Sequence, residues 1–312
     1  MSAVIQFNDV CKLYGSEVAL AGVSFEVPAG TVFALLGENG AGKTTAIRIM
    51  LGLSNADHGR STVLGMDSET YGERIRRRVG YVAERPTLYD WMTVREIGWF
   101  ASGFYPDGYL TCYLQQVGQF ELPLNRKIKA MSKGQRAKVS LALALAHDPE
   151  LMILDEPTSG LDALVRREFL ESMVDRAAAG KTVLLSSHQI VEVERVADIV
   201  AIIRKGKLMT LQRLDELKGR IREVTVTLGD ETDTAMPPAL AELNGRLLSR
   251  RQRGRQWQAL VDGMPEGLET SLRQQVGVRA VDVRTPSLEE IFVAYMERSE
   301  GTQDPNAREV TP

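Results

Sequence analysis

Short apolar runs divide the first two thirds of the chain and predict strands of a buried sheet. The runs cover Val32–Leu36, Leu151–Leu154 and Thr182–Leu185. Each is short, rich in residues that favour strands and free of polar interruptions, which is typical of a strand covered on both faces. Nearer the N-terminus, Ile5–Val10 is expected to form an edge strand.

The segment between the last two runs has the spacing of a helix. Val165, Phe169 and Met173 lie four residues apart, and Gly180 stands just past the expected end as a C-cap. A strand, a helix and a strand in this order predict a right-handed parallel crossover.

A longer helical pattern from Thr93 to His147 lies between two of the predicted strands. Thr93 and Glu96 form a capping box at its start. We therefore expect a helical insert at about residues 85–148.

The pattern changes after about Leu208, where strand-like alternation replaces the long apolar runs. We place a first domain at residues 1–215, a small α+β domain at 216–298 and a frayed polar tail at 299–312. The strands expected in the second domain are Val224–Leu228, Arg246–Ser249, Trp257–Val261 and Val278–Val283.

Composition narrows the class of protein without naming a partner. In 312 residues, 44% are hydrophobic and 25% charged, and the formal net charge is -3, so bulk charge predicts no nucleic-acid partner. Cys11 and Cys112 are too few for a disulfide framework or a cysteine zinc site, which favours a reducing cytosol. No run of about 18 apolar residues occurs, so we expect neither a membrane span nor a signal peptide.

The strongest chemical motif follows the first apolar run and opens a predicted helix that ends near Leu51. Its glycines let successive backbone N–H groups turn toward phosphate oxygens, and the helix N-terminus adds a positive end. Lys43 is expected to reach the outer phosphates and Thr44 to bind magnesium. The motif consists of Gly37, Glu38, Asn39, Gly40, Ala41, Gly42, Lys43, Thr44 and Thr45.

Two carboxylates end the second apolar run, at the sheet edge where ligands bind in doubly wound folds. Asp155 is expected to hold the magnesium shell, and Glu156 to orient or deprotonate the attacking water. Alone, such a pair is more often an ordinary acidic turn after a strand. Because a phosphate loop precedes this pair in the chain, we favour the catalytic and metal-binding roles over an ordinary turn.

The predicted roles of His188 and Tyr14 depend on the phosphate loop and the two carboxylates, because neither residue is a specific signal by itself. His188 follows the third run, where it is expected to contact the γ-phosphate and hold water, although a lone histidine there is more often a capping or packing residue. Tyr14 is expected to stack on adenine, although a lone tyrosine is more often a half-buried aromatic.

A second anion site is predicted where Met131 leads into an alanine- and leucine-rich helix. Ser132 and Gln135 fit a capping box, so free N–H groups and a serine hydroxyl face any anion there. Since one phosphate loop already holds the triphosphate, a second site indicates a second subunit that closes over the nucleotide.

In this order, the motifs resemble the ATP-binding cassette (ABC) family across roughly residues 1–210. The resemblance implies an α/β P-loop NTPase fold, with a RecA-like parallel sheet core, antiparallel β and helical subdomains, and the small C-terminal α+β domain beside it. It implies ATP and Mg²⁺ as cofactors. It also implies Tyr14 as the adenine-stacking residue, Gly37–Thr45 as Walker A, Asp155 and Glu156 as Walker B and catalytic carboxylate, Asp162 as part of the D-loop, His188 as the switch histidine, and Ser132, Lys133, Gly134 and Gln135 as the signature that contacts ATP in the opposite subunit.

Two positions depart from the family pattern. Glu84 stands where a glutamine is usual; its carboxylate is expected to approach magnesium or the attacking water, but adds negative charge near the phosphates. Lys133 replaces a glycine of the signature. We hypothesise that the Lys133 charge offsets that of Glu84, which rates of Glu84→Gln, Lys133→Gly and the double variant would test by departure from additivity.

The stretch Glu84–Val94, the Lys-Gly-Gln signature and Ser287–Phe292 resemble the bacterial drug- and antibiotic-export branch. This implies an ATPase subunit on the inner face of the cell membrane that pairs with a separate polytopic permease and with a second ABC chain, identical or related. The alternatives are an importer ATPase and a soluble ABC ATPase of translation or DNA repair. The latter usually has two cassettes or a long coiled coil, which this chain lacks.

The expected second domain also carries a group of arginines on a predicted hairpin. Most such groups form a solvated face, and the alternative is contact with anionic lipid headgroups. The group comprises Arg246, Arg250, Arg251, Arg253 and Arg255.

Overall fold

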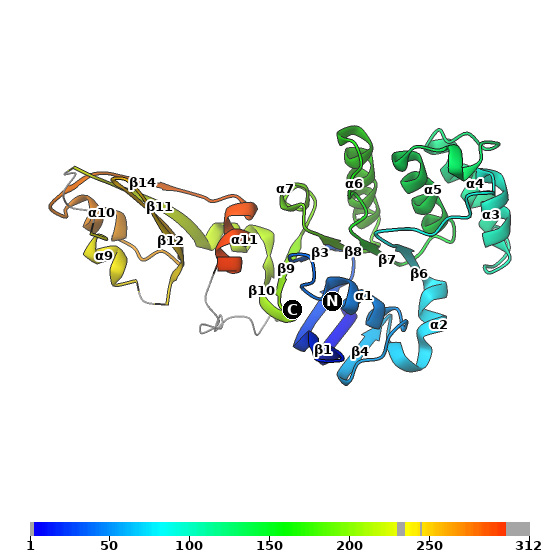
Figure 1. Ribbon diagram of the computed structural model, residues 1–312, viewed down its shortest axis with the longest axis horizontal. Coiled ribbons are helices and arrows are strands. Elements are labelled where there is room, and N and C mark those ends of the chain that lie inside the picture. The colour runs from blue at the N-terminus through cyan, green and yellow to red at the C-terminus, as the bar shows by residue number, and fades with distance from the viewer. Residues whose placement is uncertain (1–2, 230–234, 244, 298–312) are drawn as a thin grey trace. The chain divides into compact units, whose positions relative to one another are not determined.

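Figure 1 draws the computed structural model of the protein, which describes residues 3–229, 235–243 and 245–297. The predicted polar tail at 299–312 lies outside the described residues. The chain divides into two compact units, of which the first ends at Leu208 and the second begins at Met209. Among the described residues, no helix has the length and apolar character needed to cross a membrane.

A six-stranded sheet forms the centre of the first unit. Its core strands are parallel, and successive side chains along them are buried, which shows that both faces of the sheet are covered. The predicted parallel α/β core is therefore confirmed. In spatial order the strands are β10 (Lys207–Arg213), β9 (Ile199–Arg204), β3 (Val32–Leu36), β8 (Thr182–Ser187), β7 (Leu151–Asp155) and β6 (Val79–Val82).

The parallel strand–helix–strand connection predicted between β7 and β8 is also confirmed. Helix α6 (Ala163–Ala178) joins these neighbouring parallel strands and buries Phe169 and Met173, while Gly180 past its end has φ 81°. Because β3, β7 and β8 run parallel, the loops after all three leave the same edge of the sheet.

An antiparallel sheet packs beside the parallel one. Its order is β2 (Glu17–Pro28), β1 (Ala3–Tyr14), β4 (His58–Val63) and β5 (Met66–Asp67). The expected edge strand at Ile5–Val10 was wrong, because β1 pairs with β2 on one side and β4 on the other. Partners from distant parts of the chain set a strand's place in a sheet, and its own pattern does not reveal them.

The helical insert contains α3 (Val94–Ser102), α4 (Tyr109–Gln119), the 3-10 turn η1 (Ile128–Ala130) and α5 (Lys133–Leu145), and these helices gather at one end of the first unit (Figure 1). Both predicted capping boxes, at Thr93 and Ser132, are confirmed. Tyr113 is fully buried in this insert and donates a hydrogen bond of 2.8 Å to the carbonyl of Val94. The other helices of the unit are α1 (Lys43–Met50), α2 (Ser68–Arg78) and α7 (Ile190–Val193).

The second unit has the order β-α-β-β-α-β, flanked by α8 (Leu214–Arg220) and α11 (Leu288–Glu297). Its antiparallel sheet has the spatial order β12, β13, β11, β14, which is a ferredoxin-like arrangement. Val224, Leu240 and Leu272 are among its buried core residues. The remaining bounds are β11 (Ile221–Leu228), α9 (Pro238–Ala241), β12 (Leu247–Arg253), β13 (Gln256–Asp262), α10 (Leu268–Arg273) and β14 (Val278–Arg284).

The expected arginine hairpin is confirmed as the antiparallel pair β12 and β13. Arginines of this group have partners within the unit: Arg251 pairs with Glu297 of α11, and Arg246 donates a hydrogen bond of 2.9 Å to the carbonyl of Gly263. A second ion pair joins β14 to α11, where Arg284 lies 2.5 Å from Glu290 and 2.6 Å from the buried Glu223.

Acid is expected to weaken this attachment of α11. The guanidinium of Arg284, followed by the backbone N–H of Ser287, lowers the pKa of Glu290 from 4.5 to about 2. Since only the charged form makes these bonds, their stabilisation is complete above about pH 4.5 and is lost as the pH falls toward about 2. We expect Glu290→Gln to lack this pH-dependent stabilisation, so its acid unfolding, followed by circular dichroism, should differ from that of the wild-type protein. Superimposable acid transitions of the wild-type protein and the variant would contradict the assignment.

Candidate functional site

The phosphate loop joins the buried strand β3 to helix α1. At Gly42, φ is 109°, and a Cβ there would collide with the carbonyl of Ala19. At Gly37, a Cβ would lie 2.5 Å from the carbonyl oxygen of Ile203. Both positions therefore require glycine, whereas Glu38, Asn39 and Gly40 are exposed. The loop thus presents its backbone to solvent at the N-terminus of a helix, which is suited to binding an anion.

Lys43 joins this loop to the end of strand β7. Its side chain is 5% exposed, and its ammonium donates hydrogen bonds of 2.7 Å to the carbonyl of Gly37 and 3.3 Å to that of Glu38. The same nitrogen lies 3.1 Å from Oε1 of Glu156. The buried cation and the buried carboxylate therefore compensate one another's charge.

Glu156 also contacts His188, which follows strand β8. Its Oε2 accepts a hydrogen bond of 3.2 Å from the backbone N–H of His188 and lies 2.7 Å from Nδ1 of the imidazole. Glu156 has φ 47°, and its own N–H donates to the carbonyl of Ser186 at 3.1 Å. The structure thus brings Lys43, Glu156 and His188 together in one chain of contacts.

Asp155 is held beside them at 1% exposure. Its Oδ1 accepts a 2.6 Å hydrogen bond from the hydroxyl of Ser186, which stands opposite it in the register of β7 and β8. Burial raises the pKa of Tyr81 on β6 to about 12, and the charge of Asp155 acts in the same direction. Sequence reasoning missed Ser186 and Tyr81 as parts of this site; the position of Ser186 directly before Ser187 and His188 was the available signal.

The residues here fit a magnesium ion that is bound partly through a nucleotide. Asp155 keeps a second carboxylate oxygen, and Thr44 supplies a hydroxyl at the start of α1, which contacts β7. Oxygen atoms are the ligands that Mg²⁺ prefers, and it usually takes only one or two from protein together with phosphate and water. Over residues 3–229, 235–243 and 245–297, no group of three His, Cys, Asp or Glu side chains forms a metal cage.

Glu84 and Tyr14 lie outside this chain of contacts. Glu84 is exposed two residues after β6, and its carboxylate lies 3.9 Å from Nε of Arg85. Tyr14 ends β1 with 47% of its surface exposed, and the ammonium of Lys12 lies 5.6 Å from its ring centroid. Among the contacts described for this structure, none connects either side chain to the phosphate loop.

The predicted signature residues form a second group with Asp162, where the N-termini of α5 and α6 meet. Ser132 Oγ accepts a 3.2 Å bond from the N–H of Gln135, and the N–H of Ser132 donates to Oε1 of Gln135 at 3.1 Å. Asp162 caps α6 by accepting from the N–H of Val165 at 3.0 Å. Within the described residues, no contact joins this group to the phosphate loop of the same chain.

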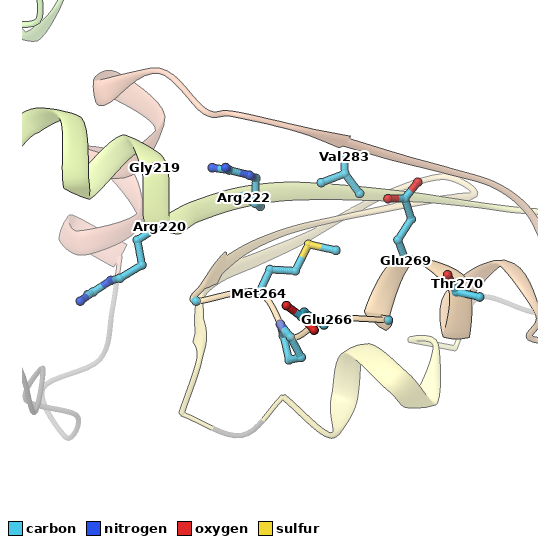
Figure 2. A pocket seen from close by; sticks show the side chains of 11 residues that line it. Gly219, Arg220, Arg222, Met264, Glu266, Glu269, Thr270 and Val283 are labelled. Atoms are coloured by element: carbon cyan, nitrogen blue, oxygen red, sulfur yellow. The ribbon is translucent and has the colours of Figure 1, made fainter.

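The second unit contains a separate hollow of about 510 Å³ at the start of α10 (Figure 2). Arg222, Met264 and Glu269 are among its lining residues. None of the residues predicted for the phosphate site is among the residues that line this hollow.

Comparisons with known proteins agree with this arrangement. The family model described as ABC transporter matches residues 20–159. Nod factor export ATP-binding protein I of Rhizobium etli is 32% identical over 298 residues, which cover 93% of this chain and 92% of that protein. Bacitracin transport ATP-binding protein BcrA of Bacillus licheniformis is 35% identical over 228 residues, which cover 72% of this chain and 74% of that protein. A solved ATP-binding subunit of an ABC transporter is 31% identical with a TM-score of 0.64, and the match covers 69% of this chain and 92% of that one.

Proposed function

Because this chain belongs to the ABC transporter family, as an ATP-binding and ATP-hydrolysing subunit, we propose that Lys43, Asp155, Glu156 and His188 form its hydrolytic site. The contacts of Glu156 with both Lys43 and His188 are the observation that carries this proposal. In this site, Lys43 and the N–H groups of the loop bind the phosphates. When the Lys43 ammonium contacts phosphate in place of Glu156, the Glu156 carboxylate becomes available to accept a proton from water.

Glu156 is the proposed general base. Its side chain is 9% exposed and is fixed by two hydrogen-bonding groups of His188, so it is held at the mouth of the phosphate loop. His188, with 44% of its side chain exposed, can contact both that carboxylate and an incoming phosphate. Thr44 and Asp155 would hold Mg²⁺, which when bound neutralises charge that develops on the phosphates.

The proposal predicts that the purified chain binds ATP and that hydrolysis depends on magnesium. Steady-state phosphate release should disappear in EDTA and return with added Mg²⁺, because Asp155 and Thr44 need the cation to engage the phosphates. Undiminished hydrolysis in EDTA would contradict the assigned metal ligands. Failure to bind ATP at millimolar concentration would contradict the phosphate site itself.

A second ABC chain, identical or related, is the proposed partner at the nucleotide. Ser132 and Asp162 cap two helices whose N-termini meet, and the free N–H groups there suit an anion. Since the described contacts do not connect them to this chain's own phosphate loop, we propose that they contact nucleotide bound to the other chain, as the relation to the family suggests.

We propose that the other partner is a separate membrane permease that docks on an aromatic patch of the helical insert. The patch comprises Tyr89, Trp91, Trp99, Phe100 and Phe104, of which Trp91, Trp99 and Phe104 are 65%, 66% and 64% exposed. Four of these rings are connected: the Tyr89 centroid lies 6.0 Å from that of Trp91 and 5.4 Å from that of Phe100, and Phe100 lies 5.4 Å from Phe104. Trp99 is the residue before Phe100 on α3. Large exposed aromatic groups of this kind mark interaction surfaces.

Neighbouring charges favour a partner segment with an apolar face and acidic flanks. Arg95, Arg126 and Lys129 are exposed on paired backbone segments beside the patch. The carboxylate of Asp90 is instead engaged, 2.6 Å from Arg136 of α5. The pair also connects the patch to the helix that Ser132 caps, so a partner here can respond to nucleotide at the signature.

Replacing Trp91 and Trp99 by serine is expected to leave basal ATP hydrolysis within about twofold of the wild-type rate. Binding to the permease should fall by about tenfold or more, because the substitutions remove two rings that the interface would bury. The measurement is co-purification from membranes together with ATPase assays. Val276→Ser, at an exposed valine of the second unit, is the matched control. Unchanged recovery of the permease with both tryptophans replaced would contradict the docking site.

We further propose that transport is export and that the protein works at the inner face of the cell membrane. The relatives named for Nod factor export and bacitracin transport support this direction. The soluble alternative in translation or DNA repair is not favoured by these comparisons.

A further inference from the structure

Ser186 places a hydroxyl inside the parallel sheet, directly after three apolar residues of strand β8, and it is fully buried. In the register of the sheet it stands between Leu35 of β3 and Asp155 of β7. Leu35 has an apolar side chain, so β7 is the neighbouring strand that offers the hydroxyl a polar partner. A buried hydroxyl without a partner would destabilise the fold. The role of this serine therefore depends on what it contacts at the end of β7.

The Ser186 hydroxyl contacts both of the consecutive acidic residues. Its O–H donates to Oδ1 of Asp155 at 2.6 Å, a distance typical of a strong hydrogen bond from a hydroxyl to a carboxylate. Its oxygen in turn accepts a hydrogen bond of 3.2 Å from the backbone N–H of Glu156. The same N–H also donates to the carbonyl of Ser186 at 3.1 Å. One serine thus orients the first carboxylate and the backbone that carries the second.

The first contact limits how the Asp155 carboxylate can rotate. Asp155 is 1% exposed, and among the residues that the structure describes, the Ser186 hydroxyl is the only side-chain donor within hydrogen-bonding distance of it. Because Oδ1 is held, Oδ2 keeps a fixed direction and remains available to another partner. Without the hydroxyl, the buried carboxylate would lack this donor and could turn.

The second contact acts on a backbone conformation that needs support. With φ 47°, Glu156 lies in the left-handed region, which residues other than glycine rarely adopt. Such a conformation persists only where the surrounding contacts hold it. Two oxygen atoms of Ser186 accept the N–H of Glu156. The direction in which Glu156 leaves β7 therefore depends on Ser186 as well as on the contacts of its own side chain.

We propose that Ser186 is a positioning residue for ATP hydrolysis, which fixes the Asp155 carboxylate for magnesium and holds the backbone at Glu156. This rests on the proposed function, in which Asp155 binds Mg²⁺ and Glu156 is the base. Ser186 acts only through these two residues and contacts neither the nucleotide nor the attacking water. The binding of metal therefore depends on its hydroxyl, whereas the binding of nucleotide by the phosphate loop does not.

The Mn²⁺ affinity of the complex between the protein and a non-hydrolysable ATP analogue tests this role. Mn²⁺ serves as the probe for the magnesium site, and electron paramagnetic resonance measures the free ion during the titration. We expect this affinity to fall about tenfold in Ser186→Ala and to stay near the wild-type value in Ser186→Thr, which keeps a hydroxyl. The affinity for ATP in EDTA, measured by calorimetry, should change by less than about twofold, because the phosphate loop is intact.

Hydrolysis should show the same difference between metal and nucleotide. In Ser186→Ala, the Mg²⁺ concentration that gives half the maximal rate should rise about tenfold, and kcat at saturating Mg²⁺ should fall only about threefold. Ser61→Ala is the matched control, since it removes a buried hydroxyl from strand β4 that lies 2.9 Å from the hydroxyl of Ser68. Its metal and ATP affinities should match those of the wild-type protein.

An unchanged Mn²⁺ affinity in Ser186→Ala would overturn the positioning role while leaving the proposed ATPase intact. Equal losses of metal and ATP affinity, together with a lower unfolding temperature, would make Ser186 a structural residue and would also overturn it. If the extra methyl prevents Ser186→Thr from folding, the comparison of Ser186→Ala with Ser61→Ala decides. A wild-type complex that binds Mn²⁺ no more tightly than the free nucleotide does would instead contradict the proposed metal site itself.

Discussion

Glu156→Gln is expected to reduce kcat for ATP hydrolysis by about a hundredfold or more while leaving ATP binding intact. The amide is nearly the same size and can still accept a hydrogen bond from the N–H of His188, but it cannot take a proton from water. It also removes the negative charge 3.1 Å from the Lys43 ammonium, so Lys43 becomes freer to bind phosphate. ATP affinity should therefore be equal or somewhat tighter.

Steady-state phosphate release and equilibrium ATP binding separate these two effects. Glu150→Gln makes the same chemical change at an exposed carboxylate paired with Arg78, directly before β7, and should retain hydrolysis. Wild-type rates in Glu156→Gln would remove Glu156 from the role of base. A parallel loss of binding and rate would make it a structural residue.

Lys43→Ala is expected to weaken ATP binding by about a hundredfold, because the cation that meets the phosphates is lost. The same change leaves the buried Glu156 without its ammonium partner, so the local fold should also lose stability. Titration with ATP measures the first effect, and thermal unfolding measures the second.

Lys181→Ala serves as the control for Lys43→Ala. It removes an ammonium paired with Asp148 directly before β8, where no phosphate is expected. The double variant Lys43→Ala with Glu156→Gln should recover much of the lost stability, since neither buried charge then remains. Normal ATP affinity in Lys43→Ala would contradict the assigned phosphate contact.

Strands and helix caps were the features best predicted from sequence. The apolar run Val32–Leu36 coincides with β3, and the capping boxes at Thr93 and Ser132 occur as expected, because each depends on residues within a few positions. The place of β1 inside its sheet was not predictable in this way. It depends on pairing with β2 and β4, of which β4 lies about fifty residues away.

The candidate site shows the same division between local and distant contacts. The order of the motifs predicted roles for Lys43, Glu156 and His188 at a nucleotide site. They meet because the strands that precede them end at the same edge of the sheet. The bond from Ser186 to Asp155 depends on the register of two strands that α6 separates.

The association with a membrane permease can be measured with tagged Glu156→Gln protein that is held with ATP in native membranes, gently solubilised and analysed by mass spectrometry. We expect stoichiometric recovery of a polytopic membrane protein with ATP, and much less when Lys43→Ala replaces Glu156→Gln. Recovery of ribosomes, nucleic acid or only soluble proteins would contradict the claim that this ATPase drives a membrane permease.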